Sequence, residues 1–353
     1  MTLRQMRISV FVKRLGLGVV PLLLLSLPSP GQLPNTGQLP GASPLIADPA
    51  DTRFRGVDED WTSPSLSKSH LRPVKPLKFV ADHDSYTTEL VRVQWRWGDP
   101  IDLYVSRPKG VKKPPVVLYL FGYPYDTELF QDEGFQADAT KDGFAAVGFV
   151  TALTGHRYHD RPMKRWFVSE LQECLAVSAH DVQMVLDYLA SRGDLDMDRV
   201  GVFSQLSGAS IGILASAADP RIKVLDALDP WGDWPTWMAT SLFVPNDERP
   251  DYVKPEFLSG VALLDPVDWM PKIQAKKFRL EQRSYEPETP VASKEKLQKA
   301  LPPGATVGFY KSEKEFANVV GEDGRKGGDW LKGQLRALPA PAADSAAAIQ
   351  KSN

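Results

Sequence analysis

The chain has 353 residues, of which 42% are hydrophobic and 24% charged, and its formal net charge is −2. This is ordinary globular composition, and the chain is long enough for one large domain with a substantial core. The near-neutral charge gives no electrostatic reason to expect nucleic acid as a partner. The single cysteine, Cys174, excludes an intrachain disulfide and a cysteine-based metal site, and its apolar helical context favours a packing role.

Residues 1–30 have the pattern of a signal peptide or an N-terminal anchor. Basic residues precede the apolar stretch 15–27, which has the length of a signal peptide and is short for a membrane span. We therefore expect an exported protein, periplasmic or extracellular, with contact to a membrane only if this segment stays uncleaved. Residues 31–56 are rich in proline and glycine and predict a linker.

The predicted folded domain covers residues 57–336, and the Ala/Pro-rich residues 337–353 predict a disordered tail. Residues 89–97 and 101–107 alternate around a Gly-Asp-Pro turn and predict a β-hairpin. The apolar run 116–120 is typical of a strand buried on both faces. Further strands are predicted at 144–150, 200–203, 221–228, 276–282 and 306–310, with helices at 167–192 and 207–218.

This alternation predicts an α/β domain with a doubly wound, mostly parallel sheet and right-handed crossovers. Residues 230–271 interrupt the pattern. They are rich in aromatic residues and predict an irregular cap insertion over the ends of the strands.

Residues 198–210 have the pattern of a buried strand, a sharp turn and a helix of small residues. This is the context of a nucleophile elbow, small-x-nucleophile-x-small, which holds a reactive serine on a strained turn. Ser204 and Gly208 match the small flanking positions, and Leu206 matches the apex. Leucine has no lone pair with which to attack a carbonyl group. A serine on such an elbow acts in a Ser-His-acid triad, whose histidine follows the serine in the chain. Here all five histidines precede the turn.

Four segments carry a family resemblance: PPVVLYLFG, DMDRVGVFSQLSGAS, ADPRIKVLDALDPWGDW and ALPPGATVGFY. With them, residues 85–335 resemble the α/β-hydrolase superfamily, in particular its dienelactone-hydrolase-like and acetyl-xylan-esterase-like members. The resemblance implies an α/β-hydrolase-type sheet and, if the chain is active, a serine esterase acting on carboxylic esters. The superfamily hosts many chemistries, so the function has to be argued from the site.

The resemblance also implies where the pocket lies. The loop after the first central strand supplies an oxyanion-hole amide in such enzymes, and here that loop contains Gly122, Tyr123 and Tyr125. A backbone amide can still donate when the side chain changes. We therefore expect this loop and Leu206 to border the pocket.

The remaining triad positions are implied in the same way. Counting back from Pro290 places Glu286 in the position of the acid, and the position of the histidine falls at Glu315. A carboxylate at neutral pH is a poor shuttle for a serine proton. The interpretation is that the chain lacks a working Ser-His-acid triad, with Leu206, Glu286 and Glu315 in degenerate positions.

An alternative triad stays open. Shifting the elbow by one residue makes Ser207 the nucleophile. The alternative interpretation is that its hydroxyl satisfies a backbone N–H at the start of the helix. His156 or His159 follows the strand at 144–150 and would be the base, and Asp229 follows the strand at 221–228 and would be the acid. The His-x-x-His spacing is weak as a metal motif, and no metal or other cofactor is predicted. His180 lies on the long helix and is predicted to be structural.

Three tryptophans, Trp231, Trp234 and Trp237, follow Asp229 closely. They either pack the cap onto the sheet or, with Trp231 in the pocket, offer flat apolar faces to a ring, a sugar or an acyl chain.

Three functional hypotheses follow. The first is an exported hydrolase-fold protein that binds a small ester, sugar or aromatic ligand without turnover. The second is an active carboxylic-ester hydrolase that uses Ser207, and the third is an envelope interaction protein with a vestigial cleft. The sequence does not fix the oligomeric state.

Overall fold

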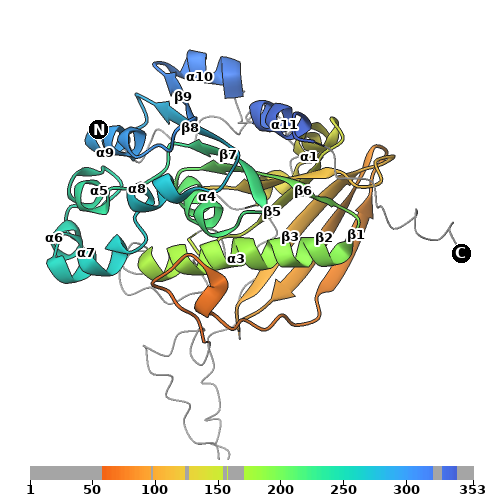
Figure 1. The fold of residues 1–353 in the computed structure, drawn as a ribbon, viewed down its shortest axis with the longest axis horizontal. Coiled ribbons are helices and arrows are strands. Elements are labelled where there is room, and N and C mark those ends of the chain that lie inside the picture. Colours follow the sequence, from red (N-terminus) through yellow and green to blue (C-terminus); the bar gives the residue numbers. More distant parts are fainter. Residues whose placement is uncertain are drawn as a thin grey trace, which may run out of the picture. The chain divides into compact units, whose positions relative to one another are not determined.

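The computed structural model describes residues 58–96, 98–123, 127–153, 157, 171–320 and 328–339. The predicted signal peptide or anchor, the linker and most of the predicted tail lie outside these residues. Within them, one nine-stranded sheet is covered by helices (Figure 1). No helix in the described ranges combines the length and the apolar character needed to cross a bilayer.

The sheet has the strand order β1-β2-β3-β5-β4-β6-β7-β8-β9. Strands β1 to β3 and the β3–β5 pair are antiparallel, and all later pairs are parallel. The predicted α/β class with a doubly wound, mostly parallel sheet is therefore confirmed. The strands are β1 (Leu77–Asp82), β2 (Tyr86–Gln94), β3 (Pro100–Pro108), β4 (Pro115–Leu120), β5 (Ala145–Phe149), β6 (Asp196–Gln205), β7 (Ile222–Leu228), β8 (Lys277–Arg283) and β9 (Thr306–Tyr310).

Helices connect the strands and cover the sheet. The main ones are α1 (Glu133–Thr140), α3 (Leu171–Arg192), α4 (Ser207–Ala218), α9 (Val291–Lys299), α10 (Glu313–Val320) and α11 (Gly328–Arg336). Short 3-10 turns are η1 (Leu66–Lys68), η2 (Glu128–Gln131) and η4 (Met270–Lys272). Sequence reasoning predicted α4 with its observed bounds but missed α9, α10 and α11.

The cap between β7 and β8 is helical, where an irregular insertion was expected. It contains α5 (Trp234–Thr240), α6 (Arg249–Tyr252), α7 (Pro255–Ala262) and α8 (Pro266–Trp269). Each of these helices has a proline at its first or second position. Proline is tolerated there because the first N–H groups of a helix have no intrahelical acceptor. The frequent prolines of the cap therefore start helices instead of excluding them.

Strand β4 shows how the sheet separates two hydrophobic cores. Val116, Leu118 and Leu120 belong to a core that includes residues of α3 and α4, and Val117 and Tyr119 belong to one that includes residues of α1 and α11. Successive side chains of a strand point to opposite faces, so a run without polar residues can fill both cores.

The strand register brings several strand ends to one edge of the sheet. Leu120 of β4 pairs with Ser204 of β6, and the next residue of β6 pairs with Leu228 of β7, which in turn pairs with Glu281 of β8. The residues that follow these positions therefore meet at the C-terminal edge of the parallel strands. Ligand sites of open α/β sheets lie at this edge.

A buried ion network ties the start of the domain to α3. Asp181 of α3 accepts hydrogen bonds from Trp95 Nε1 (2.7 Å), Arg157 (2.7 Å) and Arg96. Arg96 also donates its Nε to Glu59 (2.7 Å), which precedes the sheet. Burial alone would raise the pKa of Glu59, but its contacts with Arg96 and a histidine lower that pKa to about 2.

That histidine is His180, whose two ring nitrogens lie 2.6 Å from Glu59 Oε1 and 2.9 Å from the Ser63 carbonyl oxygen. Its ring is fully buried. His180 therefore holds the segment before the sheet against α3, in agreement with the structural role expected from the sequence.

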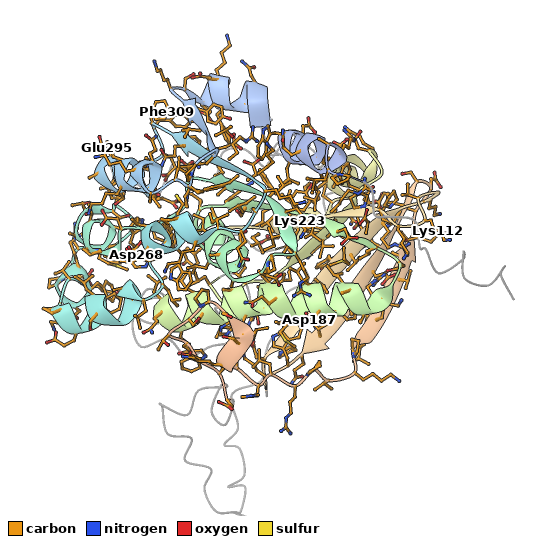
Figure 2. The ribbon with its side chains drawn as sticks, in the orientation of Figure 1. Lys112, Asp187, Lys223, Asp268, Glu295 and Phe309 are labelled. Atoms are coloured by element: carbon orange, nitrogen blue, oxygen red, sulfur yellow. The ribbon has the colours of Figure 1, made fainter. Side chains whose placement is uncertain are left out.

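Replacing Asp181 tests the energetic weight of this network. We expect Asp181→Asn to lower the free energy of unfolding by about 3 kcal/mol, because two buried guanidinium groups lose a shared counter-charge. Asp187→Asn is the matched control. Asp187 lies on the same helix (Figure 2), its side chain is 58% exposed, and its pair with Arg221 at 2.6 Å is worth less than about 1 kcal/mol. Urea unfolding measures the free energy of unfolding of both variants. Equal losses would contradict the larger contribution assigned to the buried network.

Candidate functional site

Leu206 is the single residue between the end of β6 and the start of α4. Its backbone has φ 52° and ψ −123°, an unfavourable conformation for a leucine. Hydrogen bonds hold the turn on both sides, because Leu206 donates its N–H to the Leu228 carbonyl (2.9 Å) and accepts from the Ala209 N–H (3.0 Å). The structure thus places Leu206 at the apex of a strained strand-turn-helix connection, with its side chain buried.

Two glycines allow this turn to pack closely against the end of β4. A Cβ atom at Gly122 would lie 2.5 Å from the Leu206 Cβ and 2.7 Å from the Gln205 carbonyl oxygen. A Cβ atom at Gly208 would lie 2.7 Å from the Phe121 carbonyl oxygen. Backbone atoms cannot move aside as a flexible side chain can, so any larger residue forces the turn and the loop after β4 apart.

A methyl group at Gly208 should therefore be costly. We expect Gly208→Ala to lower the free energy of unfolding by about 3 kcal/mol through overpacking against backbone. Gly333→Ala in α11 is the control, since a Cβ there meets nothing within 4 Å. It should stabilise the helix by about 0.5 to 1 kcal/mol. Chemical unfolding of both variants measures the difference, and a neutral Gly208→Ala would refute the close-packing argument.

Ser207, the alternative nucleophile, is fully buried at the start of α4. Its Oγ accepts a hydrogen bond of 2.8 Å from the N–H of Tyr123. Tyr123 is in the loop expected to supply the oxyanion-hole amide, so this donor is occupied by the Ser207 hydroxyl. The N–H groups of Ser207 and Gly208 precede the first intrahelical bond of α4, as the first amides of a helix do.

Three of the residues predicted for the site lie outside the described residues: Tyr125, His156 and His159. The described histidines have other partners. His70 lies 2.7 Å from Asp58, His83 stacks on Tyr86, and His180 is in the buried ion network. Within the described part of the chain, no group of three or more His, Cys, Asp or Glu residues is arranged to hold a metal ion.

Asp229 lies directly after β7, is fully buried and has φ 46°. Its Oδ1 accepts from the backbone N–H of Arg283 (2.8 Å), and its Oδ2 accepts from Arg283 Nε. Burial raises the pKa of Asp229 to about 6, although the contact with Arg283 acts in the opposite direction. The carboxylate that was predicted to orient a histidine is thus engaged by an arginine.

Arg283 was not found by sequence reasoning, because no local pattern links it to an aspartate 54 positions earlier. The parallel pairing of β7 with β8 creates the contact. The guanidinium of Arg283 also lies 4.9 Å from the ring centre of Phe316 in α10, so it connects the strand end to a helix of the C-terminal region.

The raised pKa of Asp229 predicts a defined pH dependence of stability. The unfolded carboxyl loses its proton near pH 4 and the folded one near pH 6, so the folded state gains from proton binding at low pH. That contribution is lost as the pH rises through 6. Relative to Asp229→Asn, the wild type should lose roughly 2 to 3 kcal/mol of unfolding free energy between pH 4 and pH 7. Urea unfolding at several pH values measures the difference, and parallel pH profiles would contradict the shift.

The two other carboxylates predicted at triad positions satisfy local backbone. Glu286 is buried after β8 and accepts from the N–H groups of Glu288 (2.5 Å) and Thr289 (3.1 Å). Glu315 is exposed in the first turn of α10 and accepts from the Lys311 N–H (2.7 Å), while Ser312 Oγ accepts from the Glu315 N–H (3.2 Å). Ser312 thus caps the start of α10, and the Glu315 side chain satisfies the N–H of the residue before the cap; the Ser-x-x-Glu spacing of a helix N-terminus is visible in the sequence.

The three tryptophans after Asp229 pack the cap onto the domain. Trp231, Trp234 and Trp237 are all fully buried, and their ring centres lie 4.9 Å (Trp231–Trp237) and 5.9 Å (Trp234–Trp237) apart. Phe243 of the cap lies 5.3 Å from the ring of Trp231 and 5.5 Å from the ring of Tyr123. An aromatic chain therefore connects the cap to the loop after β4.

The strand order, the helices on the sheet and the strained turn after β6 together define an α/β-hydrolase fold. No family model matches the chain, and no curated protein matches it in sequence. Similarity to solved structures is extensive. An acetyl xylan esterase from Paenibacillus sp. R4 has a TM-score of 0.57 and 16% identity, over 76% of this chain and 90% of that one.

Acetyl xylan esterase 1 from Thermoanaerobacterium sp. JW/SL YS485 gives a TM-score of 0.58 with 13% identity, over 73% of this chain and 88% of that one. A 2,6-dihydroxy-pseudo-oxynicotine hydrolase gives 0.52 with 18% identity, over 76% and 70%. The resemblance read from the sequence is thereby confirmed at the level of the fold. At identities this low, structural similarity supports the fold, and the chemistry has to be argued from the site.

Proposed function

We propose that this chain is an exported α/β-hydrolase-fold protein that binds a small organic ligand at the elbow and does not hydrolyse it. The observation that carries the proposal is Leu206, an aliphatic side chain on the strained turn where a hydrolase of this fold holds its nucleophile. A positive φ at a leucine is costly, and such strain often marks a functional turn. The strained turn is present here, but the residue at its apex cannot act as a nucleophile.

The neighbouring polar groups support the proposal that the chain does not hydrolyse its ligand. The Ser207 hydroxyl accepts a hydrogen bond from the Tyr123 N–H, and the Asp229 carboxylate accepts one from the Arg283 N–H. Glu286 and Glu315 bind backbone amides of their own turns. A hydrolytic triad needs a nucleophile bonded to a base that is oriented by an acid, and each of these groups has a different partner.

The elbow offers chemistry suited to a carbonyl or carboxylate group on an apolar body. The first amides of α4 are hydrogen-bond donors, and the helix N-terminus favours partial negative charge, whereas the amide of Tyr123 is bonded to the Ser207 hydroxyl. Leu206 and the rings of Tyr123 and Phe243 supply apolar surface nearby. Two of the similar structures are named acetyl xylan esterases, so an acetylated sugar is the first ligand to test.

Hydrolysis and binding are measured on the same variants. We expect no hydrolysis of p-nitrophenyl acetate above background by the wild type, by Ser207→Ala or by Leu206→Ser, since the histidines of the described residues are all engaged away from position 206. Binding of acetylated xylobiose, measured by calorimetry, should become about fivefold tighter in Ser207→Ala. That substitution removes the hydroxyl that accepts from the Tyr123 N–H, so a ligand oxygen can take its place, and one hydrogen bond is worth about 1 kcal/mol. Ser216→Ala, a buried serine at the far end of α4, should leave binding unchanged.

The other hypotheses correspond to different outcomes. A robust esterase rate that disappears in Ser207→Ala would establish an active hydrolase using Ser207, with His156 or His159 and Asp229. Absence of both hydrolysis and small-ligand binding would favour an envelope interaction protein with a vestigial cleft.

A further inference from the structure

The outer edge of the sheet carries an unusual concentration of exposed apolar side chains. Every residue of β1 is exposed, and the exposed fractions are 64% for Leu77, 67% for Phe79 and 60% for Val80. Val74, just before the strand, is 58% exposed. Exposed apolar residues scattered singly need no explanation, but a contiguous group marks an interaction surface. We call residues 72–80 the β1 edge surface.

Basic side chains alternate with these apolar ones. Arg72, Lys75 and Lys78 lie within the β1 edge surface, which contains no acidic residue, whereas the whole chain has a net charge of −2. Neither Arg72 nor Lys75 has an ion-pair partner among the described residues. Lys78 lies 3.4 Å from Glu89 but remains 48% exposed. The nearest acidic residue along the strand, Asp82, is paired with Lys109 at 2.9 Å.

The same segment is poorly suited to pairing with another strand. Pro73 and Pro76 have no N–H to donate, and a lysine inside an edge strand discourages strand addition. The N–H of Val74 is directed inward, to the Gln94 carbonyl at 2.8 Å. A partner of this edge would therefore contact its side chains more than its backbone.

We propose that the β1 edge surface docks on an anionic lipid surface. Strand β1 lies at the free edge of the sheet (Figure 1). Successive side chains of a strand alternate between the two faces, so Leu77 and Phe79 lie on one face and Val80 on the other, and exposed apolar groups of both faces can reach a membrane interface at this edge. The interleaved Arg72, Lys75 and Lys78 would lie at the level of the anionic headgroups. Interleaved apolar and basic groups match the two layers of a membrane interface.

A local fluorescent label tests this on the full chain. Phe79→Cys places a reactive thiol at the surface, and the native Cys174 is buried, so a polarity-sensitive maleimide dye reports on position 79. Phe309→Cys on β9, at the opposite edge of the sheet, is the matched control with 45% exposure. With vesicles of equal phosphatidylglycerol and phosphatidylcholine, the dye at 79 should shift to shorter wavelength and be quenched by nitroxide-labelled lipid. The dye at 309 should not respond.

The charge requirement is tested on the same label. Arg72→Gln, Lys75→Gln and Lys78→Gln combined should raise the vesicle concentration for half-maximal response at least tenfold, because each basic side chain is worth about fivefold in partitioning. Both proteins share the same N-terminal segment, so its contribution cancels. No response at position 79, or an equal response on phosphatidylcholine alone, would overturn the proposal. A response that depends on protein concentration without vesicles would assign the surface to a second copy of the chain and also overturn it.

Discussion

The strained turn at Leu206 is the constraint on which the candidate site depends. Its backbone conformation costs about 1 to 3 kcal/mol and persists only where the surroundings leave no alternative. Those surroundings are the Leu228 carbonyl on one side and the end of β4 on the other, which approaches so closely that Gly122 and Gly208 have no room for a Cβ. The geometry of a nucleophile elbow is therefore built into the packing of the central strands, independently of the side chain it presents.

Around this turn, the charged groups that a hydrolase would direct at a substrate are directed at the protein itself. Asp229 binds Arg283, which in turn lies against Phe316, so the acid at the end of β7 helps to hold the C-terminal region. Glu286 and Glu315 each bind backbone amides of the turns in which they lie. Charge at the edge of the sheet thus stabilises the structure of the protein.

Sequence alone predicted what depends on local pattern. The apolar run of β4 and the small residues of α4 specified buried elements, and the flanks Ser204 and Gly208 identified Leu206 as the apex of the turn. Contacts that depend on strand register were out of reach, such as those of Asp229 with Arg283 and of Ser207 with Tyr123. Strand β1 was missed because all its side chains are exposed and its pattern shows no buried face.

The central claim is that the turn after β6 presents no reactive group. Covalent labelling with a fluorophosphonate, followed by mass spectrometry of the peptide containing residues 198–221, measures this without choosing a substrate. The chain is expected to remain unmodified at Ser204, Ser207 and Ser210 under conditions that fully label an active serine esterase. A stoichiometric adduct on Ser207 would contradict it, since that outcome requires a base beside the hydroxyl.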